Sequence, residues 1–331
     1  MIASVAFRRF KALRSTSAQL GPFNLVIGPN SSGKTSLIEA LLRLRTLAKL
    51  DPLDDATALA AKVGPEIQFS FMPPHDGLQV RLGCTGETTC DALHLSPAGA
   101  PEWPALRDEI ARIRAYEFDH EAMARPVPLA DNAELASDGG NLAAVLARMK
   151  DAAPQVFATL EAEVFRLMPQ FTGIVLQRSG NDRVSLALEL AEGEGVVPAE
   201  SVSQGARYML ALLALSFEPA PPSIVCIEEI DRGIHPRRLR EVRDALYRLT
   251  YPDSFELQRA PVQVIATTHS PFLLDLFREH PEEVLITQKH GREARFERLI
   301  DRPDLGELLQ EGTLGDLWFS GILGGVPEDE I

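Results

Sequence analysis

The chain has few cysteines, and they form no recognisable pattern. Its 331 residues include three of them, Cys84, Cys90 and Cys226, with no C-x-x-C pair. Zinc sites and disulfide frameworks require regularly spaced cysteines, so we expect neither here. Cys226 lies inside an apolar run, where a cysteine usually acts as a small buried hydrophobic residue.

Long apolar runs are absent as well. Nowhere does the sequence contain the roughly 18 consecutive apolar residues that predict a membrane-spanning helix. The N-terminus has Arg8, Arg9 and Lys11 among apolar residues, but it lacks the continuous apolar core and the cleavage site of a signal peptide. We therefore expect a protein of the cytoplasm.

Positive charge is scarce. The chain has 33 Lys and Arg against 47 Asp and Glu, a net charge of -14. Proteins that bind nucleic acid through its phosphates usually carry a clustered surplus of Lys and Arg. Any contact with DNA must therefore use a local patch or a partner. The hydrophobic content of 45% is ordinary for a globular protein, and the length allows one large or two modest domains.

One stretch carries a specific signal. It follows an apolar strand-like run, Phe23 to Ile27, and precedes an amphipathic helical pattern from Ser36 to Leu47. It fits G-x-x-x-x-G-K-[ST] at every specified position. The stretch consists of Gly28, Pro29, Asn30, Ser31, Ser32, Gly33, Lys34 and Thr35. Small residues let such a backbone curl around an anion, with its N–H groups and the following helix dipole directed at a phosphate. The motif predicts a P-loop, and the alternative is a chance Gly- and Ser-rich turn.

Three residues at the end of this stretch have expected roles in binding a nucleotide. Lys34 adds a full positive charge at the phosphates. Thr35 offers a hydroxyl to Mg²⁺, which prefers oxygen ligands. Ser36 completes the set of residues that we expect to surround the nucleotide.

Two more apolar runs end in polar residues. Ser223 to Ile227 is followed by Glu228 and Glu229, and Val262 to Ala266 leads through two threonines to His269. Ligands of open α/β sheets bind beyond the carboxyl ends of the strands, so we expect both ends beside the P-loop. Glu228 is expected to hold Mg²⁺ through water, Glu229 to polarise the attacking water, and His269 to contact the γ-phosphate. Taken singly, such glutamates are often a solvated strand end, and a lone histidine is usually a polar loop residue.

Two weaker candidates complete the predicted site. Ser203 and Gly205 precede an apolar helix, Tyr208 to Ser216, and a serine at a helix N-terminus can present its hydroxyl and free N–H groups to an anion. By itself this pattern usually marks only a helix cap. Gln68 could sense the metal or the γ-phosphate, although alternation within its predicted strand, Glu66 to Phe71, also explains it.

The remaining segments predict connections and a compact insertion. Residues 85 to 200 carry no nucleotide motif and combine amphipathic helices with a hairpin, and no heptad pattern is sustained, which excludes a long coiled-coil arm. We expect a loop with a short helix from Asp51 to Lys62. The end, Pro327 to Ile331, is expected to be a frayed acidic tail.

The order of these motifs resembles that of an ABC-type ATPase. Glu228 to Pro236 resembles the E-E-x-x-x-G-[LI]-H-P signature of the RecF/SMC-like branch, in the group of prokaryotic AAA-family ATPases related to the OLD proteins. Asp138 to Leu142 and Leu314 to Gly321 also resemble segments found in that group. The resemblance covers essentially the whole chain.

The resemblance implies an α/β fold of the P-loop NTPase, ABC-ATPase head type, with a mixed or parallel sheet core and an inserted α/β lid or helical lobe. Residues 1–84 would form one ATPase lobe with the Walker A motif, 85–200 the inserted subdomain, and 201–331 a second lobe with signature, Walker B and switch histidine.

Motif by motif, Gly28 to Thr35 corresponds to Walker A, and Val202 to Ala206 stands where the ABC signature does. Glu228 and Glu229 correspond to Walker B and its catalytic base, Asp231 lies in the D-loop, and His269 is the switch histidine. Gln204 and Ala206 differ from the common LSGGQ form, and Glu228 replaces the usual aspartate.

In this family the signature serine reaches the γ-phosphate held by the opposite subunit. The resemblance therefore implies a homodimer that sandwiches ATP and Mg²⁺ and acts as a switch or clamp on DNA or on a nuclease or other effector, in anti-phage defence or DNA repair. OLD proteins carry a Toprim nuclease in the same chain. Only about 60 residues follow His269, too few for a further catalytic domain, so a nuclease is expected in trans.

Two other functions stay open at this point. The chain could be the ATPase subunit of a membrane transporter, because such subunits have no transmembrane segments of their own. It could also be a nucleotide-gated interaction module with little turnover, in which ATP binding alone sets the dimer state.

Overall fold

A computed structural model describes residues 1–53, 64–87, 89–131, 133–180, 182–191, 193, 195–291 and 293–324. The short helix expected within Asp51 to Lys62 and the expected acidic tail Pro327 to Ile331 lie outside the described residues. None of the helices in this described part combines the length and the apolarity that a membrane crossing requires.

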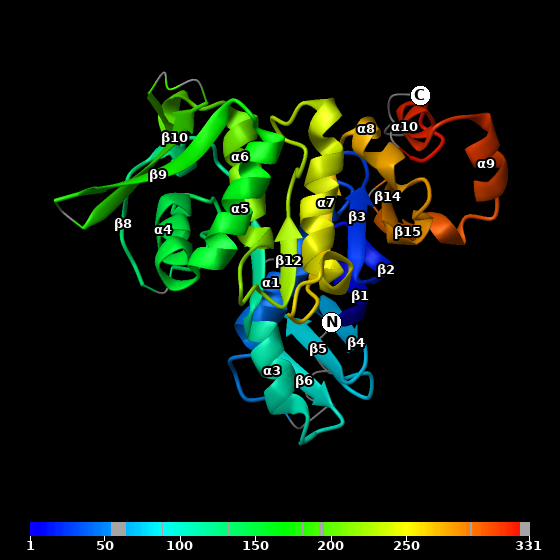
Figure 1. Cartoon of the computed structure of the whole chain (residues 1–331). Coiled ribbons are helices and arrows are strands. Elements are labelled where there is room, and N and C mark those ends of the chain that lie inside the picture. Colours follow the sequence, from blue (N-terminus) through cyan, green and yellow to red (C-terminus); the bar gives the residue numbers. More distant parts are fainter. Residues whose placement is uncertain are drawn as a thin grey trace. The chain divides into compact units, whose positions relative to one another are not determined.

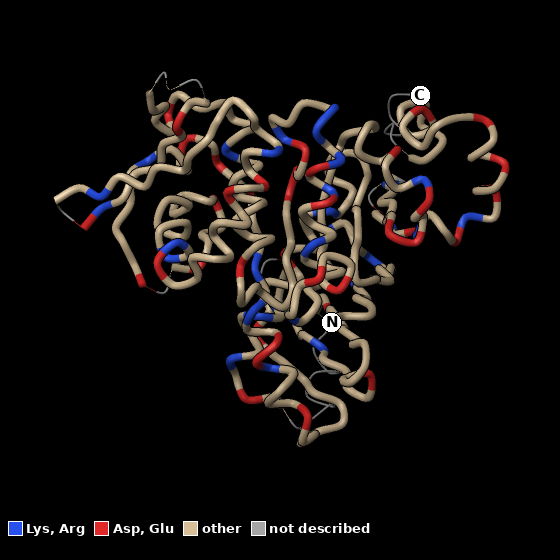
Figure 2. The backbone as a smooth tube through the Cα atoms, viewed as in Figure 1, with Lys and Arg blue, Asp and Glu red and all other residues tan. Residues whose placement is uncertain are grey.

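The chain forms two compact units. The first consists of Met1–Ala115, Pro222–Glu229 and Val262–Ile331, and the second of Tyr116–Pro221 and Ile230–Pro261. This division differs from the three consecutive segments expected from the sequence. Residues 85–115 stay with the first unit because β5 and β6 pair within one sheet on either side of residue 85. Figure 2 shows acidic positions distributed through both units.

A six-stranded sheet carries the P-loop in the first unit. Its order is β15-β14-β3-β13-β12-β7, and β14, β3, β13 and β12 run parallel. The strands are β3 (Phe23–Ile27), β7 (Ile113–Tyr116), β12 (Ile224–Ile227), β13 (Gln263–Thr268), β14 (Val284–His290) and β15 (Glu293–Arg298). Every residue of β3, β12 and β13 is buried, as expected for central parallel strands covered on both faces. The carboxyl ends of these strands therefore lie at one edge.

An antiparallel sheet forms the second layer of this unit, in the order β2-β1-β4-β5-β6. Its strands are β1 (Ile2–Phe10), β2 (Leu13–Gln19), β4 (Glu66–Phe71), β5 (Gln79–Cys84) and β6 (Cys90–Ser96). Helix α1 (Lys34–Leu47) packs its Leu37, Leu41 and Leu44 into one core with Phe69 and Val80 of this sheet. Helix α3 (Trp103–Ala111) lies beside β5 and β6 (Figure 1) and shares that core.

Short helices complete the first unit. They are α8 (Pro271–Leu274), α9 (Leu305–Glu311) and α10 (Leu314–Phe319), with 3₁₀ turns η5 (Asp275–Phe277), η6 (Pro281–Glu283) and η7 (Leu299–Asp301). α10 packs directly on α8, because Gly315 brings its backbone to the carbonyl of Pro271, where a Cβ would lie 2.7 Å from the oxygen.

The second unit combines four helices with a small sheet. The helices are α4 (Leu142–Ala152), α5 (Pro154–Leu167), α6 (Gln204–Ser216) and α7 (Leu239–Thr250), and the strands are β8 (Val127–Pro128), β9 (Phe171–Ser179), β10 (Arg183–Leu190) and β11 (Val196–Pro198). Its 3₁₀ turns are η1 (Ala122–Ala124), η2 (Ala199–Ser201), η3 (Pro236–Arg238) and η4 (Pro252–Phe255). These helices have 11 to 14 residues, so this unit is a compact lobe in the part of the chain that the structure describes.

Arg259 ties the ends of two of these helices together. Its guanidinium donates to the carbonyl oxygens of Ser216 and Glu218 at the end of α6, at 2.7 and 2.8 Å, and to that of Arg248 in α7 at 2.8 Å. A cation there satisfies carbonyls that a helix end leaves without partners. Burial lowers the pKa of Arg259 to about 10, and it still holds its proton at neutral pH.

The expectation that the cysteines form no disulfide is wrong for one pair. Cys84 and Cys90 are bonded, with their Cα atoms 3.7 Å apart, because the hairpin of β5 and β6 places them opposite each other. Their separation in sequence gives no hint of this, since strand pairing determines it. Cys226 is a buried free thiol, as expected, and burial raises its pKa to about 12.

We predict that Gln263→Leu lowers the free energy of unfolding by about 2 to 4 kcal/mol, as measured by chemical denaturation. The fully buried Gln263 amide accepts from the Ile2 N–H at 2.8 Å and donates to the Ile2 carbonyl at 2.7 Å, so leucine leaves two buried backbone groups without partners. Gln19→Leu at an exposed position of β2 is the control. A loss no larger than that of the control would refute this role of the amide.

Candidate nucleotide-binding site

The P-loop is held in a conformation that only its glycines allow. A Cβ on Gly28 would lie 1.8 Å from Thr287 Oγ1, and Gly33 has a φ of +102° in the left-handed region. The Thr287 hydroxyl, fully buried on β14, donates to the Ile27 carbonyl at 3.1 Å and accepts from Ser32. Thr287 thus fixes the loop, although it follows Ile27 by 260 residues in the sequence.

Lys34 is held inside the loop. Its Nζ donates to the carbonyls of Gly28 and Pro29 at 2.7 and 2.9 Å. Burial lowers its pKa to about 8, while the charges of Glu228 and Glu229 oppose that shift. An ammonium that gives up contacts with water in this way has a strong preference for an anion that enters the loop.

The structure brings the predicted motifs of the first unit into one pocket. This cavity of about 300 Å³ is lined by Lys11, Ala12, Asn30, Ser31, Ser32, Gly33, Lys34, Thr35, Ser36, Glu228, Glu229, Thr267 and His269. The Thr35 hydroxyl donates to Glu228 Oε2 at 2.8 Å, which joins the ends of the P-loop and of β12. The catalytic roles expected for Lys34, Glu229 and His269 stay predictions.

Glu229 and His269 are positioned by threonines of β13. The Glu229 N–H donates to Thr267 Oγ1 at 3.0 Å, and Glu229 has a φ of +49°, a left-handed conformation that a glutamate rarely adopts. Such backbone strain clusters at functional sites. The hydroxyl of Thr268 accepts from the Ser270 N–H at 2.9 Å, which fixes the turn that carries His269.

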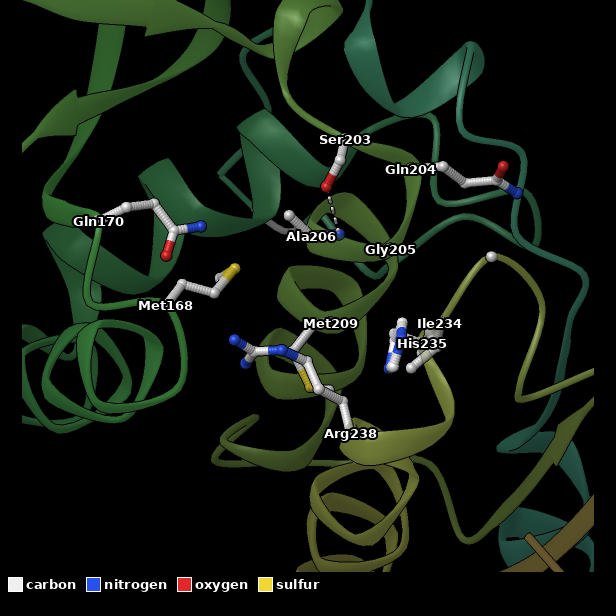
Figure 3. A pocket seen from close by; sticks show the side chains of 11 residues that line it. Met168, Gln170, Ser203, Gln204, Gly205, Ala206, Met209, Ile234, His235 and Arg238 are labelled. Atoms are coloured by element: carbon white, nitrogen blue, oxygen red, sulfur yellow. Dashed lines mark hydrogen bonds between the residues drawn. The ribbon is translucent and has the colours of Figure 1, made fainter. Parts of the chain in front are cut away.

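The predicted signature residues lie in the second unit, in a pocket of their own. It has a volume of about 240 Å³ and is lined by Met168, Gln170, Ser203, Gln204, Gly205, Ala206, Met209, Gly233, Ile234, His235 and Arg238. Figure 3 shows the Ser203 hydroxyl turned toward the Ala206 N–H, from which it accepts at 3.4 Å as the cap of α6. Position 205 has no room for a side chain, because a Cβ on Gly205 would lie 2.5 Å from the carbonyl oxygen of Gly233. Ser203 and Gly205 therefore share a site with the segment after the glutamate pair.

Gln68 is not among the residues that line the P-loop pocket. Its amide donates to Gln79 Oε1 on the neighbouring strand at 3.2 Å, and burial alternates along β4. Strand alternation accounts for this glutamine, and we do not include it in the proposed site.

Three residues of the site were not predicted from the sequence, namely Lys11, Ala12 and Thr287, and Thr267 was predicted beside the site without a role of its own. Lys11 and Ala12 line the pocket from the turn between β1 and β2, and Lys11 forms an ion pair with Glu39 of α1. The basic residues near the N-terminus could have indicated an anion-binding role. Only the arrangement of the strands in the fold, however, shows that this turn lies at the P-loop. Thr267 and Thr287 support the site through hydroxyls within apolar strands.

The residues also fit a magnesium ion. The Thr35 hydroxyl and the Glu228 carboxylate are oxygen donors of the kind that Mg²⁺ prefers, and they already meet at 2.8 Å. Among the residues that the structure describes, no group of three or more His, Cys, Asp or Glu side chains could hold a metal by itself. A magnesium ion here would complete its coordination with water and with oxygens of a bound phosphate.

Comparison with known protein families gives a match. The family described as "AAA domain, putative AbiEii toxin, Type IV TA system" matches residues 23–275, from the first P-loop strand to beyond His269. The chain belongs to this family. Comparison with curated proteins gives no match.

Solved structures share the fold. An SMC head bound to the C-winged helix domain of ScpA is 14% identical with a TM-score of 0.60, covering 89% of this chain and 96% of that one. The SMC head domain from Thermotoga maritima has 14% identity, coverages of 90% and 98%, and a TM-score of 0.51. An SMC head with an extended coiled coil from Pyrococcus furiosus, bound to the C-terminal domain of ScpA, is 15% identical with a TM-score of 0.55, covering 94% of this chain and 98% of that one.

Family and fold together identify this chain as an SMC/RecF-like, ABC-type ATPase of the P-loop NTPase fold. Both the branch and the fold class predicted from the sequence are confirmed. At these identities the structural likeness concerns the fold alone.

We predict that Gly28→Ala weakens binding of a fluorescent ATP analogue at least about tenfold, a loss of about 1.4 kcal/mol. The new Cβ would collide with both the hydroxyl and the carbonyl oxygen of Thr287, at 1.8 and 2.6 Å, so the loop must move. Gly77→Ala, which meets nothing within 4 Å, is the matched control. Unchanged affinity in Gly28→Ala would show that the loop tolerates a different conformation.

Proposed function

We propose that this chain binds ATP in the P-loop pocket and hydrolyses it. The observation that carries the proposal is that one pocket contains the buried ammonium of Lys34, the glutamate pair at the end of β12, and His269 at the end of β13. A cation for the phosphates, a base for water and a polar group at the γ-phosphate are the parts that phosphoryl transfer requires.

Each side chain has a defined task in this proposal. Lys34 exchanges the carbonyls of Gly28 and Pro29 for phosphate oxygens and keeps its proton, since a nearby anion raises its pKa. Glu229 accepts a proton from the attacking water as general base. His269 donates to the γ-phosphate and orients it. Thr35 and Glu228 would hold Mg²⁺, which when bound neutralises charge on the β- and γ-phosphates.

We further infer that two copies enclose the nucleotide. By the family resemblance, Ser203 would contact the γ-phosphate that the opposite copy holds. Helix α6 begins next to Ser203, and the backbone N–H groups of its first turn are suited to an anion. ATP would then favour the closed dimer and hydrolysis would open it, which makes the pair a switch or clamp.

The object of that switch is DNA, or a nuclease or other effector that acts in trans, in anti-phage defence or DNA repair. The family's description, which names a putative toxin of a type IV toxin–antitoxin system, supports an effector role of the defence kind. A module with little turnover is the principal alternative, and intact Glu229 and His269 argue against it.

We predict that Glu229→Gln lowers ATP turnover by about 10²- to 10⁴-fold, because the amide cannot accept the proton of the attacking water. ATP binding should survive, so light scattering should show the mass of a dimer with ATP in this variant. Lys34→Ala should lose nucleotide binding itself. Turnover would be measured as phosphate release, with and without double-stranded DNA.

Glu307→Gln on the exposed side of α9 is the matched control for the loss of one carboxylate. Phosphate release by the wild type equal to that of Glu229→Gln would overturn the hydrolytic function and favour a nucleotide-gated module. Turnover that ignores DNA would instead point to a protein trigger.

A further inference from the structure

Arginine is concentrated in one short segment of the second unit. Between Arg232 and Arg243 the chain carries five arginines and one glutamate, a local charge of +4, or +2 when the flanking Asp231 and Asp244 are counted, in a chain of net charge -14. The five are Arg232, Arg237, Arg238, Arg240 and Arg243. In Figure 2 basic positions recur along the helix that Figure 1 labels α7. This is the kind of local basic patch that DNA binding by an acidic protein requires.

Three of these arginines follow one another along one side of the segment. Arg237 and Arg240 are exposed, Arg243 is partly exposed, and each is three residues from the next. Helix α7 buries its opposite side through Leu239, Val242, Leu246 and Leu249. Tyr247 continues the arginine side, and the Arg243 guanidinium lies 5.3 Å from the centre of its ring. We call Arg237, Arg240, Arg243 and Tyr247 the arginine face.

Within the arginine face, Arg243 forms an ion pair with Asp244, with 2.9 Å between Nη2 and Oδ1. Neither Arg237 nor Arg240 pairs with a carboxylate of the described residues, whereas Arg148 pairs with Glu218 and Arg302 with Asp304. Two neighbouring arginines that pair with no carboxylate of the described residues leave positive charge available for an anion. Their mutual repulsion falls when phosphates bind between them.

His235 adds a donor beside the face. Its Nδ1 accepts from the Arg237 N–H at 3.2 Å. A neutral imidazole with Nδ1 as acceptor carries its proton on Nε2, which can therefore donate to a phosphate oxygen.

We propose that the arginine face binds the phosphodiester backbone of nucleic acid. Positions 237 to 243 run through the end of η3 and the first turn of α7 and span about 9 to 10 Å. That length covers about three phosphates of one DNA strand measured along the duplex axis, where successive phosphates are about 3.4 Å apart. Tyr247 supports Arg243 by a cation–π contact and offers an aromatic surface next to the cations. This inference specifies the residues for the DNA branch of the proposed function and rests on it.

The test compares variants by fluorescence anisotropy with a short labelled duplex and with the single strand of the same sequence, between about 50 and 200 mM salt. Arg237→Ala/Arg240→Ala should weaken binding at least about tenfold. It should also reduce the slope of log Kd against log salt by about 1.8 on the duplex or about 1.4 on the single strand, since each lost phosphate contact removes about 0.9 or 0.7. The probe bound more tightly by the wild type identifies duplex or single strand as the target.

Arg107→Ala/Arg295→Ala is the matched control, because it removes two exposed arginines of the first unit and changes the net charge equally. Arg237→Lys/Arg240→Lys should keep the salt slope. Equal losses in the two alanine pairs, an unchanged slope in Arg237→Ala/Arg240→Ala, or a wild type that binds neither probe would each overturn the proposal.

ATP turnover without DNA separates this inference from the proposed function. Arg237 and Arg240 lie outside the P-loop pocket, so Arg237→Ala/Arg240→Ala should hydrolyse ATP at the wild-type rate in the absence of DNA. Normal turnover with unaltered DNA binding overturns only the arginine face. If Arg237→Ala/Arg240→Ala loses DNA binding but the wild type shows no ATP hydrolysis, the arginine face is supported and the proposed ATPase function is refuted.

Discussion

The close approach of the P-loop backbone to β14 is the constraint on which the nucleotide site depends. Gly28 leaves no room for a Cβ against Thr287, whose hydroxyl bonds both Ser32 and the Ile27 carbonyl. The loop can curl only because the strand that supports it has a small, hydrogen-bonding side chain at that position. The anion site is therefore a product of the sheet and not of the loop alone.

Parallel strand pairing brings Glu228, Glu229 and His269 to the P-loop, although nothing in the local sequence indicates that these residues lie close together. β12, β3 and β13 point the same way, so the residues that follow them emerge at one edge although they are far apart in the chain. The charges then act on one another: Glu228 and Glu229 oppose the loss of the Lys34 proton that burial favours. The pocket is prepared for a highly charged ligand before one arrives.

Sequence predicted what depends on local pattern. The P-loop, the apolar strands β12 and β13 and the helices α4, α5 and α6 follow from spacing and periodicity, whereas α7 was not predicted. β2 was missed because its sequence is mostly polar and it lies at a sheet edge, with only Leu13 and Ala18 buried. Strand pairing, which no single segment encodes, creates the Cys84–Cys90 disulfide and keeps residues 85–115 in the first unit.

Glu229 lies at one of the four points where the chain passes from one unit to the other. It is the last residue of its segment of the first unit, and Ile230 begins the segment that carries Gly233, His235 and the arginine face. Its left-handed backbone, at a φ of +49°, is held by the bond from its N–H to Thr267. The segment that follows Glu229 along the chain lines the pocket of Ser203 through Gly233, Ile234 and His235. The proposed base for ATP hydrolysis and part of the Ser203 pocket thus belong to one continuous stretch of the chain.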